Sequence, residues 1–113
     1  MKDLNKTKQL LQTIIDLHEA KNYESLVAYV SEEEIEKASW FTPKRFMEVC
    51  EAIENEIGTI TSLEYIETLK RNTSLLTLWK ATYSKSKDEV LWQVTFDAKS
   101  YRIKLMHINW EQQ

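Results

Sequence analysis

The sequence contains very few of the residues that interrupt regular structure, because its 113 residues include one glycine and one proline. A chain so poor in both has little room for flexible linkers, and its length is typical of one domain. We therefore expect a single folded domain over residues 1–113. A core of this size is stable without disulfides or bound metal.

Cysteine is nearly absent as well, since Cys50 is the only one. A lone thiol cannot form an intramolecular disulfide, and Cys50 falls in an apolar stripe, so we interpret it as a buried structural thiol. No stretch approaches the ~20 consecutive apolar residues of a membrane span, and the first residues lack the apolar run of a signal peptide. These absences predict a cytoplasmic protein with no membrane partner.

Positive charge is not in excess, because 18 acidic residues outnumber 15 basic ones and the net charge is −3. Nucleic-acid binding needs basic residues that neutralise phosphates, so we expect no nucleic-acid partner. The two histidines and one cysteine show none of the paired spacing of metal ligands. We therefore predict no metal and no cofactor.

The first part of the chain has the 3.6-residue spacing of amphipathic helices. A first helix is predicted over about residues 4–21, with His18 near the middle of its apolar face. Asn22 can cap a second, shorter helix. A short acidic helical turn is predicted over residues 31–38.

The next predicted helix has the clearest boundaries. Thr42 is a good N-cap, Pro43 suits the first helical position, and Gly58 can end the helix in a left-handed turn. Its apolar face is predicted to contain Phe46, Val49, Cys50, Ile53 and Ile57. We expect that face to pack on a sheet.

Residues 59–110 have the pattern of an antiparallel meander, in which four segments rich in β-branched and aromatic residues are separated by polar turns at 71–74, 84–88 and 97–100. The more apolar phase of each strand predicts the register. The predicted facing pairs are Leu69 with Leu75, Tyr65 with Trp79, Trp79 with Trp92, and Trp92 with Leu105, with His107 inward beside them and Glu64 paired with Lys80 on the reverse face.

Simple alternation fails at two places, because Tyr65 and Ile66 are both apolar and Met106 is out of phase with Leu105. Either the strands contain β-bulges or the reverse face is covered too. The predicted reverse face is unusually apolar and comprises Ile66, Leu76, Leu78, Leu91, Met106 and Ile108. A second subunit is the economical cover, so we predict a homodimer that forms through the sheet.

Helices followed by a four-stranded meander resemble the nuclear transport factor 2-like superfamily, including its small uncharacterised bacterial members. The stretches that carry the resemblance are Asn22-Tyr23-Glu24-Ser25-Leu26, Phe41-Thr42-Pro43, Val90-Leu91-Trp92 and His107-Ile108-Asn109-Trp110. The resemblance implies an α+β fold, with N-terminal helices packed on a curved four-stranded antiparallel sheet (a cystatin-like cone). In that family the cone encloses a cavity, homodimers are common, and the cavity serves catalysis in steroid isomerases and dehydratases or binding elsewhere.

Five residues are candidates for lining an apolar ligand pocket: His18, Tyr65, Trp79, Trp92 and His107. Imidazoles transfer protons near neutral pH, and aromatic rings stack on flat ligands. The histidines also suit structural hydrogen bonds, and the rings also suit a filled core. No inward carboxylate completes a site of the steroid-isomerase type, so we assign no catalytic residue.

These features predict a non-enzymatic ligand-binding or protein-assembly module with an apolar cavity, which dimerises through its sheet. The alternative is a small acid–base enzyme of the isomerase or dehydratase type, which would act on a hydrophobic substrate in the same cavity. A third use is a monomer with a filled cavity whose reverse sheet face binds a different protein. Fold alone does not choose among the three.

Overall fold

A computed structural model describes residues 2–32 and 42–110 of the chain. These residues form an α+β structure, in which helices are followed by an antiparallel sheet with the strand order β1-β2-β3-β4, not closed into a barrel. The chain divides into two compact units, Met1–Cys50 and Glu51–Gln113. Residues 33–38 of the predicted acidic turn lie outside the described residues.

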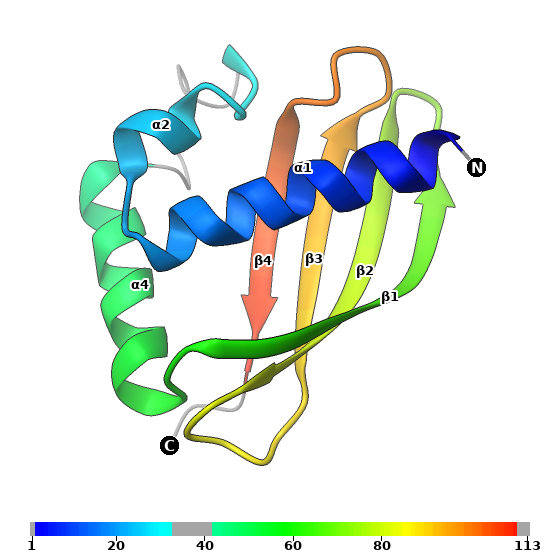
Figure 1. The fold of residues 1–113 in the computed structure, drawn as a ribbon. Helices are drawn as coiled ribbons and strands as arrows, with labels where there is room; N and C mark the ends of the chain where they lie inside the picture. The colour runs from blue at the N-terminus through cyan, green and yellow to red at the C-terminus, as the bar shows by residue number, and fades with distance from the viewer. Residues whose placement is uncertain (1, 33–41, 111–113) are drawn as a thin grey trace. The chain divides into compact units, whose positions relative to one another are not determined.

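The first unit contains α1 (Lys2–Glu19), α2 (Tyr23–Val27) and the start of α4 (Pro43–Glu56), coloured blue to green in Figure 1. The predicted apolar face of α1 is confirmed, and its buried side chains are Thr7, Leu11, Ile14, Ile15 and His18. Among the described helices, none is long and apolar enough to cross a membrane.

The junction between α1 and α2 is a Schellman motif, in which a left-handed residue ends the first helix. The Lys21 N–H donates to the His18 carbonyl at 3.1 Å, and the Asn22 N–H donates to the Leu17 carbonyl at 2.9 Å. Lys21 itself has φ 57°. The Asn22 side chain then accepts from the Ser25 N–H at 3.1 Å, which confirms the predicted cap of α2.

Replacing Lys21 with glycine should raise the free energy of unfolding by up to about 1 kcal/mol. A side chain in the left-handed region costs about 1–2 kcal/mol, and the larger entropy of glycine in the unfolded chain offsets part of the gain. Denaturant melts measure the difference. Lys8→Gly, at an exposed position inside α1, is the control and should cost about 1 kcal/mol. If both variants lost stability equally, the left-handed geometry at Lys21 would be wrong.

The start of α4 follows the sequence prediction, because Thr42 Oγ1 accepts from the Arg45 N–H at 3.2 Å. Phe46, Cys50, Ile53 and Ile57 form the buried stripe of this segment. Val49 was predicted to share that stripe, but its side chain is 39% exposed. At 100° per residue Val49 lies about 60° from Phe46 on the side away from Cys50, at the edge of the stripe.

The second unit contains the sheet, formed by β1 (Ile60–Lys70), β2 (Ser74–Tyr83), β3 (Val90–Asp97) and β4 (Ile103–Asn109). The first two turns lie where the sequence predicts them, whereas the third spans residues 98–102 and extends further along the chain than the predicted 97–100. Burial alternates strictly along β2 and β3. We call the buried side, which carries Trp79 and Trp92, the inner face, and the side that carries Leu78 and Leu91 the outer face.

The predicted register is correct in the middle of the sheet and wrong at two places. Tyr65 pairs with Trp79 and Trp79 pairs with Trp92, while Glu64 pairs with Lys80, as predicted. Leu69, however, pairs with Leu76 rather than Leu75. The partner of Trp92 in β4 is Ile108 rather than Leu105.

The error in β1 arises from a β-bulge, one of the two explanations that the sequence left open. The error in β4 arises from a β3–β4 turn that is longer than predicted and from a β-bulge. Ile66 is an extra residue in β1 and Lys104 is an extra residue in β4. One extra residue moves every following side chain to the opposite face, and it also bends the strand. Met106 and Ile108 therefore lie on the inner face, where they pair with Val94 and Trp92, and not on the outer face as predicted. Figure 1 shows the strong curvature of β1.

Candidate functional site

The inner face contains three of the five candidate residues. Trp79 and Trp92 are buried and Tyr65 is half-buried. The Tyr65 and Trp79 rings meet edge to face, with centroids 5.2 Å apart and planes at 68°. The Tyr65 hydroxyl donates to Thr68 Oγ1 at 2.8 Å. The aromatic row predicted from the alternation therefore exists.

The indole N–H groups of this row are bonded within the sheet. Trp79 Nε1 donates to Thr77 Oγ1 at 2.8 Å, and that hydroxyl donates to the Val94 carbonyl at 2.7 Å. Trp92 Nε1 donates to the Tyr83 hydroxyl at 2.9 Å. Buried polar groups with such partners stabilise a unique core. The N–H donors of these buried indoles are therefore already used.

His18 lies in the other unit, in the last turn of α1, and is only 6% exposed. Its ring meets Phe46 edge to face at 5.3 Å. Cys50 Sγ lies 3.8 Å from both ring nitrogens, and the thiol donates to the His18 carbonyl at 3.5 Å. Burial lowers the pKa of His18 from 6.5 to about 4, so the imidazole is neutral at neutral pH.

The contact between His18 and Cys50 was missed by the sequence reasoning. Each residue was placed correctly on the apolar face of its own helix, but periodicity does not reveal which position of one helix meets which position of another. A thiol beside a neutral imidazole can act as a nucleophile with the imidazole as its base. Here Cys50 is buried and the ring packs on Phe46, so a substrate cannot reach the pair. Within residues 2–32 and 42–110, no group of three or more His, Cys, Asp or Glu residues could hold a metal ion.

His107 was predicted to point inward, and that prediction is wrong. It pairs with Gln93 and is exposed on the outer face, because the bulge at Lys104 reverses the phase of β4. The structure thus brings Tyr65, Trp79 and Trp92 together on one face and places His107 on the other.

The outer face carries a row of residues that crosses all four strands: Leu69, Leu76, Thr95 and Leu105. Leu69 is 37% exposed and Leu105 is 50% exposed. Ile66, at the bulge of β1, is 51% exposed. The half-buried Leu78 and Leu91 lie on the same face. We call these six apolar side chains the outer leucine patch: Ile66, Leu69, Leu76, Leu78, Leu91 and Leu105.

One lysine of the outer face is held by two carboxylates. Lys80 Nζ lies 2.9 Å from Glu89 and 3.3 Å from Glu64. The hydrogen bonds to Glu89 and Glu64 raise the pKa of Lys80. The ammonium group of Lys80, the residue that pairs with Leu91 of the outer leucine patch, is therefore engaged by two carboxylates.

Comparison with known proteins finds no matching family model, no matching curated protein and no matching solved structure.

Proposed function

We propose that the chain is a non-enzymatic assembly module of the nuclear transport factor 2-like type, which forms a homodimer through the outer face of its sheet. The outer leucine patch is the observation that carries the proposal, because several large apolar side chains exposed on one face mark an interaction surface. The order of the elements and the bulged, curved sheet support the cystatin-like cone.

The size of the patch suits a dimer of moderate affinity. Burying a half-exposed leucine is worth about 1 kcal/mol, so twelve such side chains in a pair give on the order of 10 kcal/mol. Association costs at least about 4 kcal/mol in lost freedom of motion. At most about 6 kcal/mol therefore remains, which corresponds to a dissociation constant of roughly 40 µM or weaker.

The row next to the leucine row is self-complementary in hydrogen bonding, because a carboxylate and an imidazole stand at its two ends. It runs from Glu67 in β1 through Leu78 and Gln93 to His107 in β4. A two-fold axis parallel to the strands would place β1 of one copy over β4 of the other. Glu67 would then approach His107 of the partner subunit, twice in each dimer, at the rim of the apolar contact.

The side chains fit the enzyme alternative less well. That alternative needs an accessible imidazole beside a polar group on the inner face. His107 lies on the outer face, and His18 is buried against Phe46 and Cys50. The donors of Trp79 and Trp92 are satisfied internally. This arrangement favours binding or assembly over proton transfer.

Binding of an apolar ligand is the second candidate function. The half-buried Tyr65, whose ring meets Trp79 edge to face, favours it, since this end of the aromatic row retains exposed ring surface. A ligand would stack on the Tyr65 ring, because Trp79 and Trp92 are buried. We therefore propose a flat apolar molecule as the ligand class.

Sedimentation equilibrium at roughly 500 µM, above the expected dissociation constant, tests the dimer. The wild type should have twice the chain mass, and Leu105→Glu or Leu76→Lys should have the mass of one chain, because each places a charge in the contact. Val49→Glu is the matched control, since Val49 is 39% exposed but belongs to α4. Circular dichroism confirms that each variant is folded. A monomeric wild type, or a dimer that survives in both leucine variants, contradicts the proposal.

A further inference from the structure

Two turns far apart in the sequence meet at one end of the sheet. The β1–β2 turn (71–73) and the β3–β4 turn (98–102) are joined where the Ala98 N–H donates to the Thr73 carbonyl at 3.0 Å. Beside this bond Ser74 pairs with Asp97. Figure 1 shows both turns at the same end of the sheet, opposite the β2–β3 turn.

Positive charge is concentrated at this end. Its basic residues are Lys70, Arg71, Lys99, Arg102 and Lys104, and we call this set the basic end. Asp97 is the acid among them, so this end carries about +4 in a chain whose net charge is −3. The argument from net charge, which predicted no nucleic-acid partner, does not detect this local concentration of positive charge.

The backbone fixes the two arginines at the ends of one row. The Arg71 N–H donates to the Ser74 carbonyl and the Asp97 N–H donates to the Arg102 carbonyl, both at 2.8 Å. With strands roughly 4.8 Å apart, Arg71 and Arg102 are separated by about 14 Å. The hairpins thus hold the charges as a fixed array.

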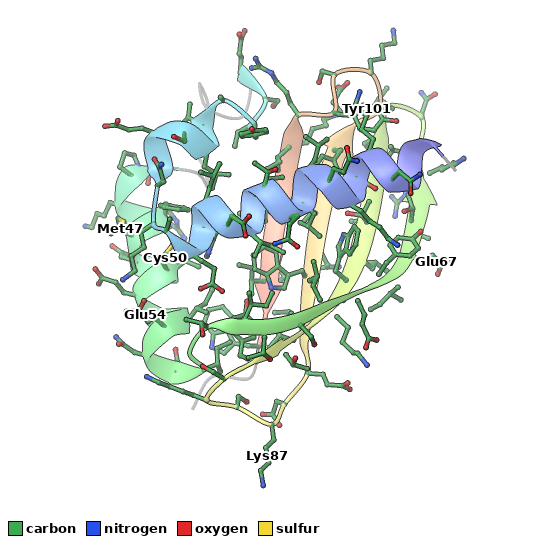
Figure 2. The ribbon with its side chains drawn as sticks, in the orientation of Figure 1. Met47, Cys50, Glu54, Glu67, Lys87 and Tyr101 are labelled. Carbon is green, nitrogen blue, oxygen red and sulfur yellow. The ribbon has the colours of Figure 1, made fainter. Side chains whose placement is uncertain are left out.

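Asp97 has a structural task in this array. Its Oδ1 accepts from the N–H groups of Lys99 and Ser100, both at 2.9 Å. These backbone hydrogen bonds lower the pKa of Asp97, and the charge of Lys104 contributes in the same direction. Tyr101 follows with φ 59° and is half-buried at the tip of the turn, as Figure 2 shows. The array therefore combines five cations with one amphipathic ring.

We infer that the basic end is a docking surface for an anionic lipid bilayer. Two adjacent turns, joined by the Ala98–Thr73 bond, present their basic residues together at one end of the sheet, which suits a flat anionic surface. Each basic residue near such a surface strengthens binding about fivefold, and a tyrosine is favoured at the interface. No membrane-spanning segment is needed for contact of this kind.

A plane also suits the charge distribution better than a long nucleic acid does. Asp88 and Glu89, at the far end of β3, lie on the order of 25 Å from the basic end, well beyond the ~8 Å over which charges act at physiological salt. A planar surface touches the basic end and leaves those acids distant. A polymer that wraps further along the protein would approach them.

Cosedimentation with phosphatidylserine-containing vesicles tests the inference. We expect binding at low salt, no binding to pure phosphatidylcholine vesicles, and release as the salt concentration rises. Arg71→Glu with Lys99→Glu should weaken binding at least about 25-fold. Lys87→Glu is the matched control, because Lys87 is an exposed lysine in the turn at the opposite end of the sheet, as Figure 2 shows. It should bind like the wild type.

Three results would overturn the inference. The first is an absence of binding to phosphatidylserine vesicles at low salt. The second is equal weakening in Lys87→Glu and in the double variant, because general charge rather than the basic end would then be responsible. The third is tighter binding to a single-stranded oligonucleotide than to vesicles, with the same dependence on Arg71 and Lys99. Circular dichroism of the double variant confirms that it is folded.

Discussion

Replacing Gly58 with alanine is expected to lower the free energy of unfolding by about 3 kcal/mol or more. Gly58 follows α4 with φ 89°, a conformation that side chains rarely adopt. An added Cβ would overlap Ser84 Oγ and would lie 2.9 Å from Lys85 Cγ and 3.2 Å from the Lys85 backbone nitrogen. The strain and the overlap therefore act together.

The surrounding backbone cannot move away without losing hydrogen bonds. The Lys85 N–H donates to the Ile57 carbonyl and the Ser84 N–H donates to the Thr59 carbonyl, both at 2.8 Å. Asn55→Ala, an exposed substitution three residues earlier in α4, is the control and should leave stability unchanged or slightly higher. Denaturant melts compare the two variants. A cost below about 1 kcal/mol at Gly58 would mean that the turn relaxes, contrary to the geometry.

Acidification from pH 7 to below pH 4 is expected to remove about 3 kcal/mol of stability through His18 alone. The pKa of His18 is about 4 in the folded chain and 6.5 as an unperturbed group, because burial disfavours the charged ring. The unfolded state therefore binds the proton more strongly. The contribution is fully present above pH 6.5, falls as the pH drops through the interval, and is lost below pH 4.

His18→Gln isolates this contribution, because glutamine does not titrate. Both proteins are melted in denaturant at several pH values, and the difference between their unfolding free energies is plotted. The difference should shift by about 3 kcal/mol between pH 7 and pH 4 in favour of the variant, whereas carboxylates that titrate in both proteins cancel. Parallel curves for the two proteins would show that His18 is not buried as a neutral ring.

The helix boundaries were predictable because they depend on local chemistry. Asn22 and Thr42 accept hydrogen bonds from the first turns of their helices, and only Gly58 suits the conformation that follows α4. Lys21 was not predicted to be left-handed, since a lysine carries no signal for that conformation. Helix boundaries that are set by a residue's own conformation or by its side chain can thus be predicted from a single sequence.

The register could be predicted only as far as the alternation is unbroken. The adjacent apolar residues Tyr65 and Ile66 signalled the bulge in β1. In β4 both alternating sets of residues are apolar. The prediction placed Ile103, Leu105 and His107 together on the inner face. The extra residue Lys104 lies between Ile103 and Leu105. Its position depends on pairing with β3, which the sequence of one strand does not specify.

The candidate sites required the fold for a different reason, because they join residues that are distant in the sequence. Cys50 meets His18 from another helix, and the Thr73 and Ala98 turns come together only when β2 and β3 pair. The composition gives the net charge but does not show that basic residues gather at one end of the sheet. The aromatic row could be predicted from the sequence, since Trp79 and Trp92 lie in strands whose alternation is unbroken.

Homodimerisation through the outer leucine patch is tested most directly by isotope-filtered nuclear Overhauser spectroscopy. The sample mixes methyl-labelled and unlabelled protein at a concentration where the dimer is populated. We predict intermolecular contacts among the methyl groups of Leu69, Leu76 and Leu105, and none to the buried Val94 of the inner face. Intermolecular contacts that avoid these leucines, or their absence in a sample of dimer mass, would contradict the account.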